Sequence, residues 1–269
     1  SNYDNYICLL KYNMKGEYVN MIDAKRFEEE ICSLLDVLYD SQKDNIEATA
    51  QAFKECIENG GVCHVFGSGH SVGLGIDIKN RVGAMVPIHI MEMTDFVTKG
   101  GISPEEFLDR KNIFERKPNV AGKLFELYDI KPQDIFIVIS NSGINGIVID
   151  IARLAKEQGN KVIIVTSMKH TLAEEPRHPS GKRLYEMVDL AMDNCAPSAE
   201  AMIEVPGIEA RFAAASGIAC DILLWSMTAV AIEKLQEKGI TPGVLKSANF
   251  PGGPEYNKVL NENYDKFGW

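Results

Sequence analysis

Short apolar runs alternate with longer amphipathic stretches along most of this chain. Runs of about five apolar residues that end in Gly, Ser or Thr are typical of strands buried on both faces of a parallel sheet. Helical spacing between the runs predicts the crossover helices that parallel strands need. The pattern therefore predicts an α/β fold with strands over 62–66, 86–90, 135–139, 161–165 and 188–193.

Three segments between and around these strands have a distinct pattern. Residues 22–59 show helical spacing, and the polar pair Asp40-Ser41 predicts a break into two helices. Residues 208–238 are rich in Ala and Leu on most faces, which predicts one long helix buried in the core or at a subunit interface. Residues 94–118 are polar and irregular, which favours a lid or binding loop, or else a surface insertion with a short helix.

The chain of 269 residues has the length of one domain with an appended arm. Residues 1–21 are unrelated in pattern to the rest of the chain, and we interpret them as an N-terminal extension that is either non-native or disordered. Residues 22–269 then form a single domain with N-terminal helices and a C-terminal helical arm. The length is sufficient for a full core without disulfides or metals.

The charge balance argues against two classes of partner. Lys and Arg total 28 against 38 Asp and Glu, a formal net charge of −10. Nucleic acids and anionic membranes both require a basic surface, so neither is expected as a partner. The sequence contains no apolar run of about 18 residues and no recognisable signal peptide, so we expect a cytoplasmic protein.

The cysteines do not form a metal-binding or disulfide pattern. No C-x-x-C spacing occurs, and no histidine cluster accompanies them, so we expect neither a metal nor a cofactor. We interpret them as reduced and mostly buried thiols. The six are Cys8, Cys32, Cys56, Cys63, Cys195 and Cys220.

Three predicted strands end in similar polar loops. In an open parallel sheet, ligands bind outside the carboxyl ends of the strands. Glycine allows close approach of the backbone, helix N-termini favour an anion, and hydroxyls donate hydrogen bonds. A phosphate ester fits all of these groups, although plain helix capping is the alternative. The candidate phosphate-binding residues are Ser68, Gly69, His70, Ser71, Ser140, Asn141, Ser142, Asn145, Thr166 and Ser167.

A dinucleotide site is the second alternative for the first loop. The segment from Gly67 to Gly73 places its third glycine one position late for G-x-G-x-x-G. Glu92, near the end of the second strand, would then be the acid that binds the ribose. This interpretation leaves the loop that contains Ser140 and Ser142 without a role.

The loops also resemble those of the sugar isomerase (SIS) domain family. The matching segments are 65–71, 137–143 and 162–167, and the resemblance extends over roughly residues 22–267. It is strongest to a single-domain subgroup similar to phosphoheptose isomerase, through 178–184 and 247–253.

This resemblance implies a three-layer α/β/α, flavodoxin-like fold with a five-stranded parallel sheet. It also implies a phosphorylated sugar as ligand and assembly into a homodimer or homotetramer. By position, Ser140, Ser142 and Asn145 would hold the phosphate, with Ser68 and Thr166 beside them.

The predicted function is binding and aldose–ketose isomerisation of a phosphorylated sugar or amino sugar. This reaction passes through an enediol and needs a carboxylate or imidazole base. Glu92 is our candidate base because it directly follows the second strand, and His178 is our candidate for opening the sugar ring. Either residue could instead have only a structural role in its loop. A non-catalytic phosphosugar sensor and a related phosphosugar lyase or deaminase are the other hypotheses.

Overall fold

The computed structural model describes residues 22–79, 81–114, 117 and 119–265. The predicted N-terminal extension, residues 1–21, lies outside the described residues.

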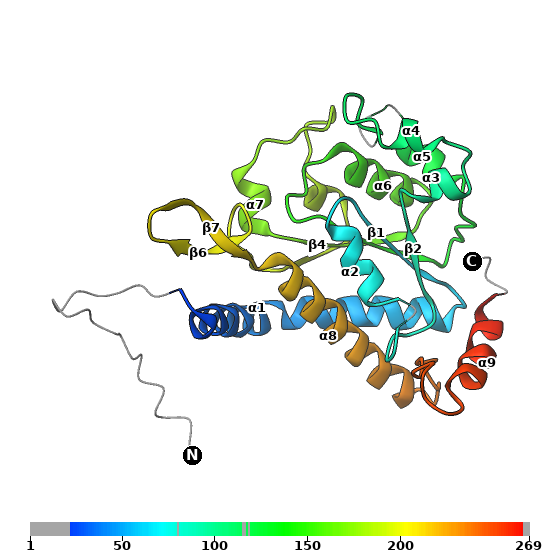
Figure 1. Cartoon of the computed structure of the whole chain (residues 1–269). Coiled ribbons are helices and arrows are strands. Elements are labelled where there is room, and N and C mark those ends of the chain that lie inside the picture. The colour runs from blue at the N-terminus through cyan, green and yellow to red at the C-terminus, as the bar shows by residue number, and fades with distance from the viewer. Residues whose placement is uncertain (1–21, 80, 115–116, 118, 266–269) are drawn as a thin grey trace, which may run out of the picture.

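A five-stranded, all-parallel sheet forms the centre of the molecule (Figure 1). The strand order is β2-β1-β3-β4-β5, which is the doubly wound order of flavodoxin-like folds. β1 and β3 are buried along their whole lengths, as expected for strands covered on both faces. The strands span Cys63–Gly67 (β1), Ile88–Met91 (β2), Ile135–Ile139 (β3), Lys161–Thr166 (β4) and Leu190–Asp193 (β5).

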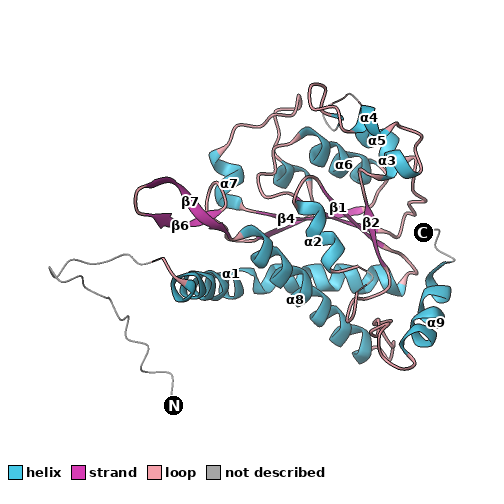
Figure 2. Cartoon of the chain, in the orientation of Figure 1, coloured by secondary structure: helices cyan, strands magenta, loops and turns pink. Residues whose placement is uncertain are grey.

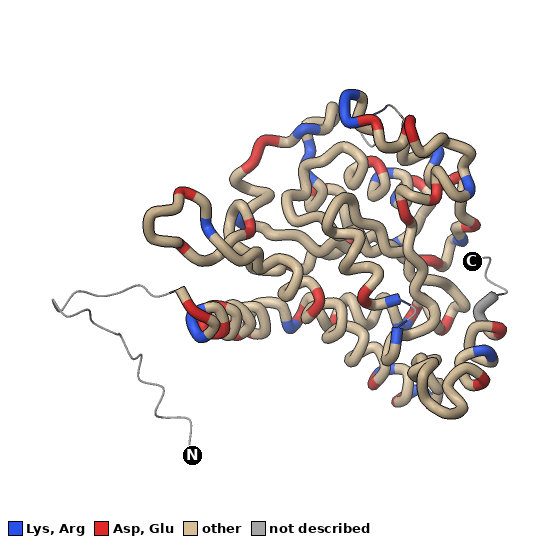
Figure 3. Tube along the Cα trace, viewed as in Figure 1, with Lys and Arg blue, Asp and Glu red and all other residues tan. Residues whose placement is uncertain are grey.

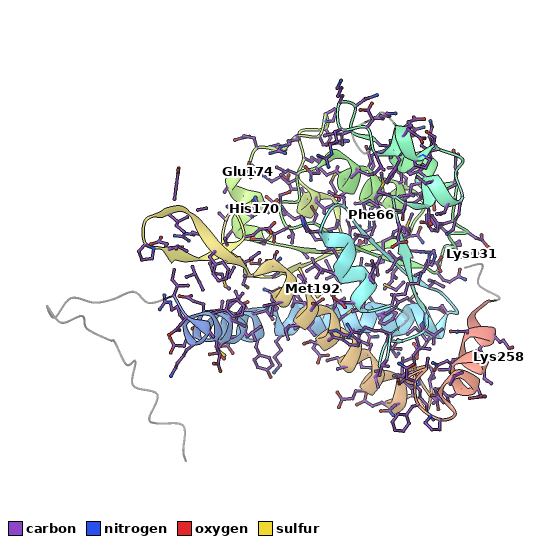
Figure 4. All side chains as sticks on the ribbon, in the orientation of Figure 1. Phe66, Lys131, His170, Glu174, Met192 and Lys258 are labelled. Carbon is purple, nitrogen blue, oxygen red and sulfur yellow. The ribbon has the colours of Figure 1, made fainter. Side chains whose placement is uncertain are left out.

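Helices cover both faces of this sheet, which confirms the three-layer α/β/α prediction. Alternate side chains of each strand enter one of two apolar cores, and Phe66 and Met192 belong to opposite cores (Figure 4). The first core is closed by α1 (Ala24–Glu58), α2 (Ser71–Asp77) and α8 (Ser216–Glu237). The second is closed by α5 (Val120–Phe125) and α6 (Gly146–Glu157).

Shorter helices decorate the loops. The described part of the segment 94–118, which was predicted as a lid or an insertion, contains helices of four residues at 95–98 and 104–107. Phe96 and Phe114 from this segment are buried in the second core. The shorter helices of the whole described chain are α3 (Asp95–Thr98), α4 (Pro104–Phe107), α7 (Met168–Ala173), the 3₁₀-helix η2 (Leu184–Met187) and the C-terminal α9 (Gly253–Asp265).

The predicted break at Asp40-Ser41 is wrong, because α1 is one continuous helix of 35 residues. The Ser41 hydroxyl donates to the Leu38 carbonyl, a bond that a serine can make inside a helix. Leu38 and Gln42 are buried, so tertiary packing holds this turn in place.

The prediction of one helix over 208–238 is wrong as well. Residues Ala201–Val205 (β6) and Ile208–Ala214 (β7) pair as an antiparallel hairpin, and α8 begins only at Ser216 (Figure 2). Gly207 at the turn has φ 76°, a left-handed conformation that glycine adopts at little cost. Ala213 also has a positive φ of 66°, which prevents helix from extending back into β7. Strand pairing thus overrides the helix propensity of the alanines.

Candidate functional site

The carboxyl ends of β1 and β3 form the wall of one cavity of about 310 Å³. The parallel pairing of β1 with β3 places Gly67 beside Ile139, so the loops after these two strands are neighbours. The structure therefore brings together most of the predicted phosphate-binding residues. The lining includes Ser68, Gly69, His70, Ser71, Ser140, Asn141, Ser142 and Asn145.

The loop after β3 is fixed by its own hydrogen bonds. The buried Ser140 Oγ accepts from the Gly143 N–H at 3.2 Å, and Gly143 has φ 61°. Asn145 is the N-cap residue of α6, but its side chain makes no capping hydrogen bond. The cavity wall at Asn145 therefore also borders the N-terminus of a 12-residue helix, where backbone N–H groups favour an anion.

Asn141 is held in place from two sides. Its Oδ1 accepts from Asn194 Nδ2 at 2.9 Å, and its Nδ2 lies 3.0 Å from Nδ1 of His170 in α7. Both partners follow other strands of the sheet, since His170 comes after β4 and Asn194 after β5. The loop after β3 is thus braced by side chains that follow β4 and β5.

The loop after β1 depends on close backbone approach. A Cβ atom at Gly67 would lie 2.6 Å from the Ser71 carbonyl oxygen, closer than real contacts allow. Gly69 has φ 59°, the left-handed conformation. These two glycines let the chain turn directly from β1 into α2 and place Ser68 and Ser71 on the cavity.

Thr166 and Ser167 lie outside the residues that line the cavity, and both are buried. The Thr166 hydroxyl donates to the Asn141 carbonyl at 3.2 Å. The Ser167 hydroxyl donates to the Ala196 carbonyl at 2.7 Å and accepts from the His170 N–H. In this structure their hydroxyls therefore support the surrounding loops.

Glu92 also lies outside the cavity lining, although it directly follows β2 as predicted. Its backbone N–H donates to the Tyr128 hydroxyl at 2.9 Å, and that hydroxyl donates in turn to the Asp95 carboxylate. Burial lowers the pKa of nearby Lys79, and the charge of Glu92 opposes this shift. The structure thus places Glu92 in a polar cluster at the sheet edge, away from the serine loops.

His178 lines a second, neighbouring cavity of about 600 Å³. Its Nε2 lies 3.4 Å from Asp150 Oδ1, and its Nδ1 lies 2.7 Å from the Ser180 hydroxyl. The two cavities share Asn145 in their walls. His178 is therefore adjacent to the serine-lined cavity and does not line it.

Part of the cavity wall comes from residues that the sequence pattern did not predict. Glu200, Ser216 and Gly217 line it together with Leu74. The Ser216 hydroxyl is 3.2 Å from Glu200 Oε2. Because one helix was expected over 208–238, Ser216 was placed in the middle of a helix, whereas it is the first residue of α8. A usable signal was present in the polar loop after the fifth strand, because that loop also begins at the carboxyl edge of the sheet.

The described part of the chain offers few groups for metal binding or thiol chemistry. Its residues hold no group of three His, Cys, Asp or Glu side chains arranged to bind a metal ion. Cys56, Cys63, Cys195 and Cys220 are buried, and burial raises the pKa of the Cys56 thiol to about 12. Among the described helices, none has the length and apolar character required to cross a bilayer.

The strand order and the serine-rich loops at the carboxyl edge define a doubly wound α/β protein with its site at the switch point of the sheet. The chain belongs to the SIS domain family, whose sequence model matches residues 26–167. A UPF0309 protein of Geobacillus kaustophilus is 33% identical over 239 residues, covering 89% of this chain and 93% of that protein. A UPF0309 protein of Listeria innocua is 33% identical over 233 residues, covering 87% of this chain and 92% of that protein.

Two solved structures share the fold at low sequence identity. The phosphoheptose isomerase of Francisella tularensis has a TM-score of 0.50 and 16% identity, covering 78% of this chain and 96% of that one. The phosphoheptose isomerase GmhA of Neisseria gonorrhoeae has a TM-score of 0.50 and 15% identity, with the same coverage of 78% and 96%. These similarities establish the architecture of the chain.

Proposed function

We propose that this protein binds a phosphorylated sugar or amino sugar in the serine-lined cavity and isomerises it between aldose and ketose forms. The observation that carries this proposal is that the loops after β1 and β3 line one cavity with hydroxyls beside the start of α6. Its volume of about 310 Å³ lies at the small end for ligand pockets. A sugar phosphate has the size and the chemistry for such a site.

The binding chemistry favours a phosphate recognised through neutral donors. Lys and Arg are interspersed with Asp and Glu along the described chain (Figure 3), and none of the described residues lining the cavity is Lys or Arg. Hydroxyl and backbone N–H donors bind a phosphate dianion without such cations, because hydrogen bonds to a charged acceptor are strong. Membership of the SIS family and the fold shared with phosphoheptose isomerases support the same class of ligand.

Within this proposal, Glu92 as the base and His178 as the group that opens the sugar ring are hypotheses from the sequence. Both stand outside the wall of the serine-lined cavity, so a direct role requires that a bound substrate extend beyond it. The non-catalytic sensor and the lyase or deaminase hypotheses use the same phosphate site. They differ from isomerisation in what happens to the sugar once it is bound.

Proton NMR in D₂O tests the reaction. The protein is incubated with a panel of aldose and ketose phosphates, and deuterium incorporation next to the carbonyl is followed together with product formation. Isomerisation predicts exchange at that carbon and appearance of the other isomer. Binding of these sugars without exchange would favour a sensor, and loss of ammonia or of a substituent would favour a deaminase or lyase.

A further inference from the structure

Glu200 is the only carboxylate among the described residues that line the serine-lined cavity. We infer that Glu200 is the base that moves the proton between adjacent carbons of the sugar phosphate, an inference that rests on the proposed function. The other titratable group in the described wall is His70. The cavity thus contains a carboxylate and an imidazole, and either type of group can act as the base in an enolisation.

The position of a carboxylate in this wall needs an explanation. Two like charges repel, so a carboxylate in a phosphate site lowers affinity unless it faces another part of the ligand. Glu200 enters from the loop between β5 and β6, whereas the phosphate donors come from the loops after β1 and β3. A carboxylate on a separate wall element is suited to contact the uncharged carbon skeleton.

The backbone around Glu200 is strained. Ala199 and Glu200 have φ values of 61° and 70°, both in the left-handed region that residues with a Cβ rarely occupy. Such conformations persist only where the surrounding structure enforces them, and they cluster at functional sites. Two consecutive left-handed residues with side chains therefore destabilise this loop, which indicates that their conformation serves the site.

The β6–β7 hairpin enforces this conformation. The Glu200 N–H donates to Pro197 O at 3.0 Å, and the Ala215 N–H donates to Glu200 O at 3.1 Å. Ala201 pairs with Ala214 at the base of the hairpin, so the chain enters it beside Glu200 and leaves it beside Ser216. The Ser216 hydroxyl then lies 3.2 Å from Glu200 Oε2 and orients the carboxylate. The hairpin thus clamps Glu200 and Ser216 at one wall of the cavity.

The proton balance of the reaction closes with these two groups. Glu200 takes the proton from C2, the C–H electron pair forms the C1=C2 bond of the enediol, and the C1 oxygen gains a proton. Glu200 then returns its proton to C1 while the C2 hydroxyl loses its own and becomes the ketone. The oxygen protons cancel, so His70 or a water that carries one from O2 to O1 completes the step without any redox partner.

The test compares Glu200→Gln with the wild type and with Glu209→Gln. Glu209 is an exposed carboxylate of the same hairpin on β7, away from the serine loops, and serves as the matched control. With a sugar phosphate that the wild type exchanges, Glu200→Gln should lower solvent deuterium exchange by about 10²- to 10⁴-fold. Its dissociation constant, measured by calorimetry, should stay within about threefold or become smaller, and Glu209→Gln should match the wild type in both measurements.

Two failures can be told apart. Equal exchange by Glu200→Gln and wild type overturns the inference while the proposed function stands. Absence of exchange by the wild type, with sugar phosphates that it binds, overturns the proposed isomerisation and the role of Glu200 with it. If Glu200→Gln loses both ligand binding and deuterium exchange, the role of Glu200 as the base is also contradicted, since this result indicates a structural role.

Discussion

Individual residues of the cavity wall have separable tasks. Ser140 is 5% exposed and its hydroxyl accepts a backbone hydrogen bond within its own loop, so it shapes the loop. Ser142 lines the cavity from the same loop and is more exposed. Asn141 links the loop to α7 and to the end of β5. We therefore expect Ser142 to be the residue of this loop whose side chain contributes most to ligand binding.

Replacing Ser142 with Ala should weaken binding of a sugar phosphate by about 10- to 100-fold. The loss corresponds to one hydrogen bond to a charged group, about 1.5–3 kcal/mol. Calorimetric titration of wild type and variant measures it. Ser198→Ala is the matched control, because the Ser198 hydroxyl is exposed and donates to the Lys169 carbonyl outside the cavity. An unchanged affinity in Ser142→Ala would remove this loop from the site.

A buried histidine pair makes stability depend on pH. His64 Nε2 lies 3.0 Å from Asp134 Oδ2, and its Nδ1 lies 3.3 Å from Nδ1 of His89. The pKa of His89 is lowered to about 3, first by burial and then by the charges of His64, Lys79 and Lys99. The native state therefore keeps His89 neutral where the unfolded chain already binds a proton.

This pair predicts a loss of stability as the pH falls from about 6.5, the usual histidine pKa, towards 3. His89 contributes a slope of up to about 1.4 kcal/mol per pH unit to the free energy of unfolding in that range. Urea unfolding at several pH values should show a smaller slope for His89→Asn than for the wild type. Parallel slopes in the two proteins would contradict the assignment, whatever the variant costs in stability at neutral pH.

At the scale of elements, the sheet was predictable and the hairpin was not. The run at 135–139 coincides with β3, because a strand buried on both faces is apolar throughout. In β7, Ile208, Ala210 and Phe212 alternate with Glu209 and Arg211, but this short alternation runs into alanines that favour a helix, and β7 is exposed along most of its length. The serine loops could be found because parallel strands end at one edge, and the same rule points to the loop that contains Glu200. The position of Ser216 beside Glu200 depends on the hairpin and could not be predicted.

The turn from β1 into α2 predicts contrasting effects of two glycine substitutions. Gly67→Ala should lower the free energy of unfolding by roughly 1–3 kcal/mol, because its Cβ would meet the Ser71 backbone. Gly73→Ala should instead raise it by about 0.5–1 kcal/mol, since this helical position has open space around it and alanine favours helix. Urea unfolding compares the two variants. A Gly67→Ala variant as stable as the wild type would refute the close approach.

At the scale of the whole molecule, the hairpin stands apart from the main sheet (Figure 1). Its side chains Ile208 and Phe212 are 61% and 54% exposed. An isolated two-stranded hairpin is marginally stable in water unless something packs on it. A second copy of the chain would supply that packing, which agrees with the homo-oligomer that the family resemblance implies.

Light scattering at micromolar concentration should accordingly give the mass of two or more chains of 29.8 kDa each. Phe212→Glu should shift the protein towards the monomer, because a charge on the hairpin face opposes apolar packing. Leu108→Glu, at another exposed apolar side chain after α4, should leave the mass unchanged. A monomeric wild type would contradict this expectation.

We propose above all that the serine-lined cavity recognises the phosphate of a sugar phosphate. Calorimetry of the wild-type protein tests it most directly, with sugar phosphates and the same sugars without phosphate. We predict that a phosphorylated sugar binds at least about 100-fold more tightly than its unphosphorylated form, since at least two charge-assisted hydrogen bonds are lost without the phosphate. Equal affinity for the two forms, or no binding of any sugar phosphate across a broad panel, would contradict the account.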